Sequence, residues 1–419
     1  MPAFAVQTGQ ACQACHIGAF GPQLTPFGRQ FKLNGYTMRA GGFTPPVSAM
    51  AVASYVHTLE DQSAPPAPHY ATNNNTTIDE VSLFIAGGYG DHFGSFAQVT
   101  YDGVGRSMSW DNLDLRFVDH ATVAGSDVLW GLSLNNNPTI QDAWATLPGW
   151  GFPFTDSGLA PAPSAGTLLS GALAQNALGL SAYAWWDDHI YSEFGLYTSL
   201  SPDFLKTVGV DPADTSSLRS AAPYVRFAYQ KDYGDQNFEL GAFGLFASLN
   251  PGRDTTTGLG DRYNDIGVDV SYQYTGDGTN IVTANARYVN ESQSLKASQA
   301  LGDSFAANLR LNEISANASY YYKNTYGFSV GAFNTWGSAD PLLYGANSTF
   351  KPDSSGFNFQ LDVTPFGGDE PLLGTRANVR AGIQYTAYTK FDGAASNYDG
   401  LGHNASDNNT LRIFVWTAF

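Results

Sequence analysis

Two cysteines and a histidine near the start of the chain carry the clearest chemistry in the sequence. Cys12, Cys15 and His16 form a Cys-x-x-Cys-His run, and the 419 residues contain no other cysteine. This run is the attachment signature of a c-type haem. The two thiols add to the two vinyl groups of the porphyrin, and the imidazole binds the iron as the proximal ligand. The sequence therefore predicts one covalently bound haem c, with Cys12 and Cys15 as its tethers and His16 on the iron.

A chance match, half of a zinc site and a redox-active dithiol are the competing interpretations of this run. A structural zinc site needs a second ligand pair at comparable spacing, and the sequence has none. A thioredoxin-like dithiol is expected between a strand and a helix, whereas Gly and Pro residues flank this run. Haem attachment is the interpretation that the residue types and their spacing favour.

The sixth ligand of the iron has three main candidates. Met38 lies within the haem segment, whereas Met50 and His57 lie in the first expected strand. Met50 and His57 are seven residues apart and of opposite parity, so at most one of them faces the inside of a barrel. They are separated by about 23 Å along an extended strand. The identity of this ligand therefore reports the height of the haem in the barrel.

Basic residues in the same segment are candidate partners of the haem propionates. Arg29, Lys32 and Arg39 follow the haem motif at short range. A charge that is buried inside a barrel must be paired, and propionates supply the opposite charge. The alternative is that these cations pair with inward-facing acids of the wall, such as Asp269 or Glu239. The two roles are compatible.

The segment that carries these residues, 1–46, needs a host. A unit of this length seldom buries enough apolar surface to fold without help. A covalent haem supplies part of that help, but the remaining apolar surface requires a larger partner. We therefore expect residues 1–46 to form a cytochrome segment held by residues 47–419.

Composition identifies the kind of host. Gly occurs 45 times, Tyr 23 times and Phe 27 times, and only 14% of residues are charged. The net charge of −17 argues against a nucleic-acid partner, because no basic stripe is present to neutralise phosphates. No apolar run approaches the ~20 residues of a transmembrane helix. A membrane role would therefore be that of a β-barrel, with outer-membrane lipid around it.

Alternating apolar and polar residues predict sixteen strands after residue 46, an even number. Loops of Gly, Asn, Asp and Pro separate them and alternate between long and short, as in outer-membrane barrels. Aromatic residues stand at many strand ends, where lipid interfaces favour them, and the chain ends on Phe419. The fold class is therefore all-β, a sixteen-stranded antiparallel outer-membrane β-barrel with the c-type haem segment in its lumen. The expected strands are 47–59, 78–86, 93–101, 113–121, 128–134, 178–186, 190–199, 223–229, 238–249, 263–274, 281–290, 306–322, 326–336, 357–363, 377–390 and 411–419.

Two long loops carry further possibilities. Residues 138–166 do not resemble a strand, and we expect them to fold into the lumen, to lie over the mouth of the barrel, or to form a plain surface loop. In the last long loop, Asp399, His403 and Asp407 could touch a cation, although a solvated acidic loop is the favoured interpretation.

The N-terminal residues resemble the fused cytochrome–porin family of the outer membrane of iron-oxidising bacteria. The resemblance rests on Phe-Ala-Val-Gln-Thr-Gly at residues 4–9, the haem motif, Leu-Thr-Pro-Phe-Gly-Arg-Gln-Phe-Lys at residues 24–32 and Gly-Tyr-Thr at residues 35–37. Beyond about residue 40 it concerns architecture only. In that family the start of the first strand resembles residues 47–50, which makes Met50 our preferred sixth ligand, with Met38 and His57 as alternatives.

This resemblance implies an electron-transfer function. Extracellular Fe(II), or another reduced donor, would reduce the haem, which would reduce a periplasmic cytochrome or copper protein. Such a chain is an iron-oxidising electron-transfer protein rather than a conventional enzyme. The haem is attached outside the cytoplasm, so we expect an export signal to have been removed before Met1. Two alternatives are a porin whose haem-bearing plug acts as a redox gate for small solutes, and a haem enzyme such as a peroxidase.

Overall fold

The computed structural model describes residues 1–42, 45–151, 153–213, 215–367 and 375–419. Within these residues, seventeen antiparallel strands form one sheet, and β1 pairs with both β2 and β17, which closes it into a barrel. One strand, β8, has two residues, so sixteen strands build the wall, as predicted. Their bounds are β1 Val47–Thr58, β2 Asn75–Tyr89, β3 Phe93–Asp102, β4 Ser107–Val123, β5 Ser126–Asn135, β6 Ala177–Trp186, β7 Ile190–Ser199, β8 Ser217–Leu218, β9 Ala222–Tyr233, β10 Gln236–Asn250, β11 Asp261–Tyr274, β12 Asn280–Leu295, β13 Asn308–Tyr322, β14 Tyr326–Gly337, β15 Ser354–Val363, β16 Asn378–Lys390 and β17 Thr410–Ala418.

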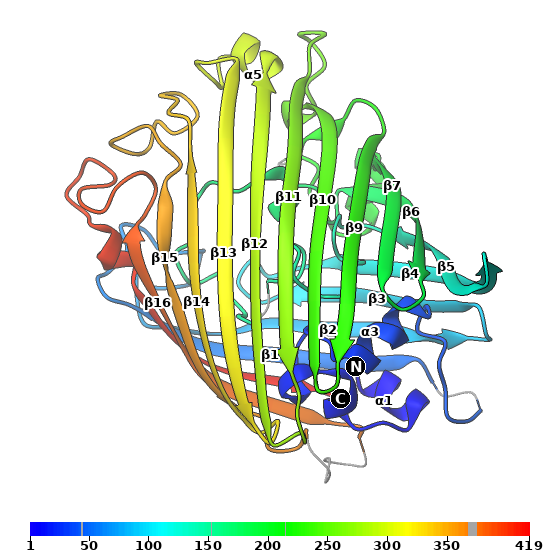
Figure 1. The fold of residues 1–419 in the computed structure, drawn as a ribbon. Coiled ribbons are helices and arrows are strands. Elements are labelled where there is room, and N and C mark those ends of the chain that lie inside the picture. Colours follow the sequence, from blue (N-terminus) through cyan, green and yellow to red (C-terminus); the bar gives the residue numbers. More distant parts are fainter. Residues whose placement is uncertain (43–44, 152, 214, 368–374) are drawn as a thin grey trace.

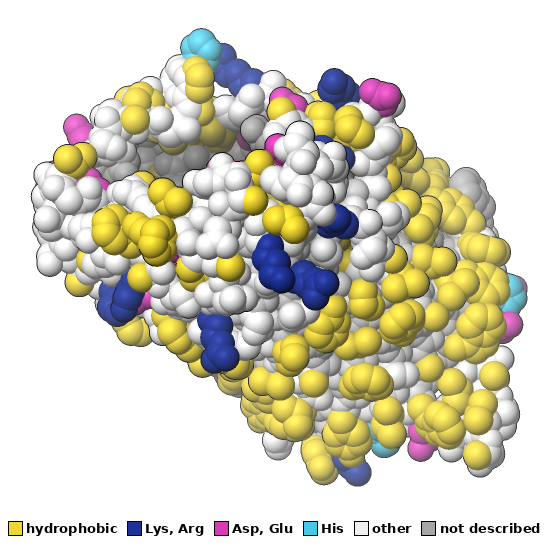
Figure 2. Space-filling view, turned by 90° about the horizontal axis from the view of Figure 1, so that it is seen from above, with side chains coloured by type: hydrophobic (Ala, Val, Ile, Leu, Met, Phe, Trp, Pro, Cys, Tyr) yellow, Lys and Arg dark blue, Asp and Glu magenta, His cyan; other side chains and the backbone are white. Residues whose placement is uncertain are grey.

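Strand alternation sorts the side chains between the lumen and the outer surface. In β11, Asp265, Asp269 and Ser271 are buried inside the barrel, whereas Ile266 and Val268 are exposed on its outside. Apolar side chains accordingly gather over the outer wall, and the rim of loops surrounds a hollow (Figure 2). The barrel has the apolar exterior and polar interior of an outer-membrane barrel.

The two ends of the barrel differ. Long connections lie at one end with α5 (Lys296–Leu301), and short turns lie at the other end with both chain termini (Figure 1). The β3–β4 connection, residues 103–106, departs from this pattern because it is short yet lies at the loop end, and so does the β15–β16 connection, residues 364–377, which is long yet lies at the short-turn end. The other short helices are α1 Pro2–Thr8, α2 Cys12–Cys15, η1 Ile17–Ala19, α3 Pro26–Leu33, η2 Leu168–Ser170, α4 Pro202–Thr207, η3 Pro251–Arg253 and η4 Ala405–Asn408.

The N-terminal segment lies in the lumen at the short-turn end (Figure 1), as predicted. Within it, α3 begins at Pro26, whose fixed φ suits the first helical position. The Thr25 hydroxyl accepts a hydrogen bond from the Gly28 N–H at 3.1 Å and caps the helix. Gly35, with φ of 61°, follows the helix and lets the chain turn back. No helix in the described part of the chain is long and apolar enough to cross a membrane.

Candidate functional site

A single helical turn presents the two cysteines. In α2 the His16 N–H donates to the Cys12 carbonyl at 2.9 Å, and the Thr25 N–H donates to the Cys15 carbonyl at 3.0 Å. Gly28 packs so closely against the Cys15 carbonyl that a side chain at this position would collide with it. The two thiols are not joined in a disulfide. Helix α3 therefore supports the turn from behind and leaves both thiols available.

Cys12, Cys15 and His16 line one cavity of about 810 Å³ inside the barrel. Its volume is in the range of cofactor sites in proteins. The segment and the wall both contribute to its lining, so neither part forms it alone. A large, flat, mainly apolar group tethered through two thiols would suit this space. Apolar and aromatic lining residues include Phe4, Phe20, Phe31, Phe84, Phe96 and Trp416.

Burial sets the protonation of the donor groups. Desolvation lowers the pKa of His16 to about 3, so its imidazole is neutral, which is the form that binds a metal. Within the described residues the buried Nδ1 atom of His16 has no hydrogen-bond partner. Desolvation also raises the pKa of Cys15 to about 11.

Of the three candidates for a sixth ligand, Met50 is the residue whose side chain reaches the cavity. Met50 is buried and lines the cavity together with the haem motif, and its sulfur accepts a hydrogen bond from Trp416 Nε1 at 3.2 Å. Met38 is not among the described residues that line the cavity, and its backbone carbonyl accepts a hydrogen bond from the Gln7 side chain. His57 lies near the loop end of β1, with Nδ1 2.9 Å from the side-chain oxygen of Asn74. Iron ligation by Met50 stays a prediction.

The predicted propionate partners lie in different places. Lys32 lines the cavity, and its Nζ donates to the carbonyls of Ile140 and Asp142 at 2.7 and 2.9 Å. Burial lowers the pKa of Lys32 to about 7. Arg29 lies behind the described lining, where Nη1 donates to the Leu24 carbonyl at 3.1 Å and the side chain of Gln273 at 3.0 Å.

Arg39 is exposed on the segment and donates to the backbone carbonyls of Thr37 and Gly90. Asp269 and Glu239 face the lumen as predicted, but both form ion pairs with Arg226 of β9. No pattern in the sequence predicts that Asp269 and Glu239 pair with Arg226, because Arg226 belongs to a strand far from the haem motif. Ionic pairing of Arg29, Lys32 or Arg39 with these two acids is therefore not observed among the described residues.

Buried polar groups of β4 hold the segment in place. The Tyr36 hydroxyl donates to Asp114 at 2.6 Å, and the same carboxylate pairs with Arg116 at 2.9 Å. Arg116 in turn donates to the carbonyls of Lys32 at 3.0 Å and Gln141 at 2.7 Å. One pair of charged residues thus joins the segment, the wall and the loop that follows β5. Neither motif nor spacing predicted this connection.

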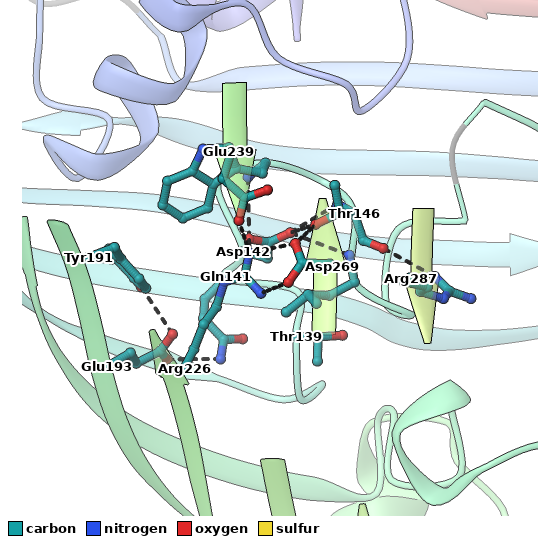
Figure 3. A network of polar contacts seen from close by, with 12 residues as sticks. Thr139, Gln141, Asp142, Thr146, Tyr191, Glu193, Arg226, Glu239, Asp269 and Arg287 are labelled. Atoms are coloured by element: carbon teal, nitrogen blue, oxygen red, sulfur yellow. Dashed lines mark hydrogen bonds and ion pairs between the residues drawn. The ribbon is translucent and has the colours of Figure 1, made fainter. Parts of the chain in front are cut away.

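The described part of the loop between β5 and β6, residues 136–176, folds into the lumen, and we call it the inner loop. This is one of the arrangements expected for residues 138–166. Asp142 of the inner loop joins Glu239 and Asp269 around Arg226, with N–O distances of 3.2, 3.2 and 3.0 Å (Figure 3). Trp144 of this loop is fully buried, and its indole N–H donates to Gln230 at 2.8 Å. The loop therefore narrows the barrel above the haem motif.

Three wall carboxylates hold the far part of the same loop. The N–H groups of Thr167, Leu168 and Leu169 donate to Glu313, Glu291 and Asp265 at 2.7, 2.6 and 2.9 Å. These acids come from three neighbouring strands, β13, β12 and β11. Side-chain oxygens at the start of a helical turn satisfy its free N–H groups, so this contact fixes η2 against the wall.

Asp399, His403 and Asp407 make contacts within the last long loop. His403 Nδ1 lies 2.5 Å from Asp399 Oδ2, and Asp407 accepts from the Asn404 N–H at 2.7 Å. The described residues contain no group of three or more His, Cys, Asp and Glu side chains that could hold a metal ion.

The closed sheet, its apolar outer band and its polar lumen define the chain as an outer-membrane β-barrel protein with a porin-like fold. Closure leaves no unpaired strand edge in contact with lipid. Its location is accordingly the outer membrane.

No family model matches the chain, and no curated protein matches it. Solved structures that are similar to it include Salmonella typhi OmpF in complex with daunomycin, at 12% identity over 89% of this chain and 97% of that chain with a TM-score of 0.49. The outer-membrane channel DcaP of Acinetobacter baumannii is similar at 10% identity over 89% and 96%, with a TM-score of 0.48. An anion-selective porin from Comamonas acidovorans is similar at 12% identity over 89% and 98%, with a TM-score of 0.46.

Proposed function

We propose that this porin-like barrel carries one covalent haem c in its lumen and conducts electrons across the outer membrane. The observation that supports this most is the shared cavity: Cys12, Cys15, His16 and Met50 all line it. Two free thiols on one helical turn, a neutral imidazole and a thioether are the donor set of a c-type haem. The residues present therefore fit the group.

In attachment, each thiol S–H adds across one vinyl C=C bond. A C–S bond forms at one vinyl carbon and the hydrogen goes to the other, so no oxidant is consumed. His16 and Met50 are the residues that would bind the iron. When bound, the haem supplies a one-electron couple.

The cavity gives the electron route two ends. The haem motif lies near the short-turn end, where a periplasmic cytochrome or copper protein would dock. The lining continues toward the loop end, where it includes Tyr388 of β16 and Pro161 of the inner loop. A small reduced donor such as Fe(II) would enter from that side. The donor rests on the family resemblance, and the long lumenal cavity is compatible with it.

The second candidate function is a porin with a haem-bearing plug that acts as a redox gate for small solutes. The porin-like barrel supports this alternative more directly than it supports electron transfer. The segment occupies the lumen at one end and Arg116 links it to the inner loop. A change in the redox state of the haem could therefore move the inner loop, which narrows the barrel.

One experiment separates the two candidates. The purified full chain is mixed anaerobically with Fe(II) while the haem absorption bands are followed, and a soluble periplasmic carrier is then added. The conduit requires reduction by Fe(II) and reoxidation by the carrier. The gate requires a solute flux into liposomes that changes with the haem redox state. The Cys12→Ser/Cys15→Ser double variant is the control, and it should lose covalent haem while keeping the folded barrel.

Haem bands that stay oxidised with Fe(II) would exclude the iron-dependent conduit. Absence of covalent haem from the wild-type protein produced with a haem-attachment system would exclude both candidates. A flux that is independent of redox state, with rapid electron transfer, would exclude the gate.

A further inference from the structure

The cavity that the haem motif lines also contains four cationic side chains in the described part of the chain: Lys32, Arg287, Arg380 and Arg412. Lys32 donates to two backbone carbonyls of the inner loop. Arg380 lies 3.4 Å from Asp362 and donates to the Gly18 carbonyl at 3.0 Å. Arg412 pairs with Asp79 at 3.1 Å. Three of the four cations are therefore already bound.

Arg287 of β12 differs from these three. Its hydrogen bond is from Nη1 to the Thr146 carbonyl, at a long 3.4 Å, and no ion pair to it occurs among the residues that the structure describes. In Figure 3 a single dashed line reaches Arg287 from Thr146. Two carboxylates act on it electrostatically, Glu313 and Asp269.

Both of these carboxylates are bound elsewhere. Asp269 accepts from Arg226 at both oxygens, and Thr146 Oγ1 donates to it at 2.6 Å. Glu313 accepts from the Thr167 N–H and hydroxyl and from Ser170. Arg287 is half-buried, and a cation that is partly withdrawn from water gains from a nearby anion. The guanidinium of Arg287 therefore has donors left for an anionic group that enters the cavity.

The position of Arg287 relates it to the haem motif. His16 forms a β-bridge with Leu24, and the neighbouring Gln23 donates to Asn285 of β12 at 3.3 Å. Asn285 and Arg287 are two residues apart on the inward face of β12, so they are separated by about 7 Å along the strand. Asn285 thus contacts the haem segment directly, and Arg287 is the next inward-facing residue of β12 in the direction of the inner loop.

We propose that Arg287 binds a propionate carboxylate of the haem. A guanidinium offers two parallel N–H donors to one carboxylate, and of the three arginines in the described lining Arg287 is the one without an ion pair. Of the partners predicted from the sequence, Arg29 lies behind the lining, Arg39 is exposed on the segment, and Lys32 Nζ donates to two backbone carbonyls. This inference rests on the proposed haem binding, because it assigns a further residue to the same cavity.

The test compares three full-length variants in detergent: Arg287→Gln, Arg287→Lys and Arg262→Gln. Arg262 is an exposed residue of the adjacent strand β11, so its loss removes the same charge outside the cavity. Covalent haem content is measured first. The midpoint potential and the resonance Raman propionate bands follow.

We expect all variants to bind haem. Loss of a nearby positive charge disfavours the reduced iron, so Arg287→Gln should lower the midpoint potential and shift a propionate band. Arg287→Lys should lower the potential less, and Arg262→Gln should leave both readouts at the wild-type values.

An unchanged potential and unchanged Raman bands in haem-loaded Arg287→Gln would overturn the assignment while leaving haem binding intact. If that variant does not fold, Arg287→Lys decides through its propionate band, which must differ from the wild type. A wild-type protein without covalent haem would instead refute the proposed function.

Discussion

The buried hydroxyl of Tyr36 provides a direct test of how the segment is held in the lumen. Tyr36→Phe removes one hydrogen bond to the Asp114 carboxylate and little else. The Tyr36 ring stacks on Phe4 at 5.2 Å between ring centroids, a contact that Phe can keep. Tyr36 already has φ of 63°, so the replacement adds no backbone strain. Burial, together with the Asp114 charge, raises the pKa of Tyr36, which therefore remains a donor at ordinary pH.

The magnitude follows from the partners that remain. Asp114 keeps Arg116 at 2.9 Å and the Ser133 hydroxyl at 2.8 Å, so the loss is confined to one bond. A hydrogen bond to a charged group contributes about 1.5 to 3 kcal/mol. Detachment of the segment should therefore become roughly 10-fold to 100-fold more favourable.

Hydrogen exchange of the α3 amides measures this change. The Arg29 N–H donates to the Thr25 carbonyl at 2.9 Å, and the Asn34 N–H donates to the Gln30 carbonyl at 2.9 Å. Both should exchange faster in Tyr36→Phe, while strand amides remain protected. The matched control is Tyr55→Phe, because the Tyr55 hydroxyl donates to Asn74 in an exposed contact at the opposite end. Wild-type exchange rates for α3 in Tyr36→Phe would refute the anchoring role of this hydroxyl.

Three further predictions concern the cavity and its walls. Lys32 has a pKa of about 7 in the folded chain against 10.5 when unperturbed; the folded state therefore binds fewer protons between these values, and its stability should rise with pH across that window. Lys32→Met should abolish this rise, as followed by protease sensitivity of the segment, and a slope equal to the wild type would count against the buried position of Lys32. Arg226→Met leaves Asp142, Glu239 and Asp269 without their cation, at a cost of about 3 to 5 kcal/mol; the inner loop should detach and single-channel conductance should increase, whereas unchanged conductance would mean that other contacts hold the loop. Met50→Ala should remove the methionine–iron charge-transfer band of the oxidised haem, and persistence of that band would eliminate Met50 as the ligand.

The sequence was sufficient for the wall of the barrel because period-two alternation is local. All sixteen predicted strands overlap observed ones, and differences such as 78–86 against Asn75–Tyr89 for β2 lie at strand ends. The lumenal position of the segment was also predictable, since 46 residues cannot bury their own apolar surface. The same parity argument showed that Met50 and His57 cannot both face the lumen, and the structure places Met50 inward.

The contacts within the lumen could not be predicted in this way. Arg226 meets Asp142 and Asp269 only because closure of the barrel brings β9, β11 and the inner loop to one height. Arg226 and Asp269 alternate with apolar neighbours like any inward polar residue, Asp142 lies in a loop, and nothing local distinguishes the three. Arg29 illustrates the same limit. It lies close to the haem motif in sequence, yet its side chain points to Gln273, 244 residues away.

The lumen holds two insertions that enter from opposite ends, and their meeting explains why the cavity exists. The haem segment enters from the short-turn end and the inner loop from the loop end. They touch at Lys32, whose Nζ donates to carbonyls of residues 140 and 142. Dedicated wall groups hold each one: Asp114 and Arg116 for the segment, and Arg226 for the loop. The charged groups at these contacts form ion pairs with one another. Arg287, which lines the cavity between the two insertions, is therefore left without a close anion. Arg116 donates to the backbone of both insertions, so one wall residue fixes the segment and the loop relative to each other and thereby sets the shape of the cavity between them.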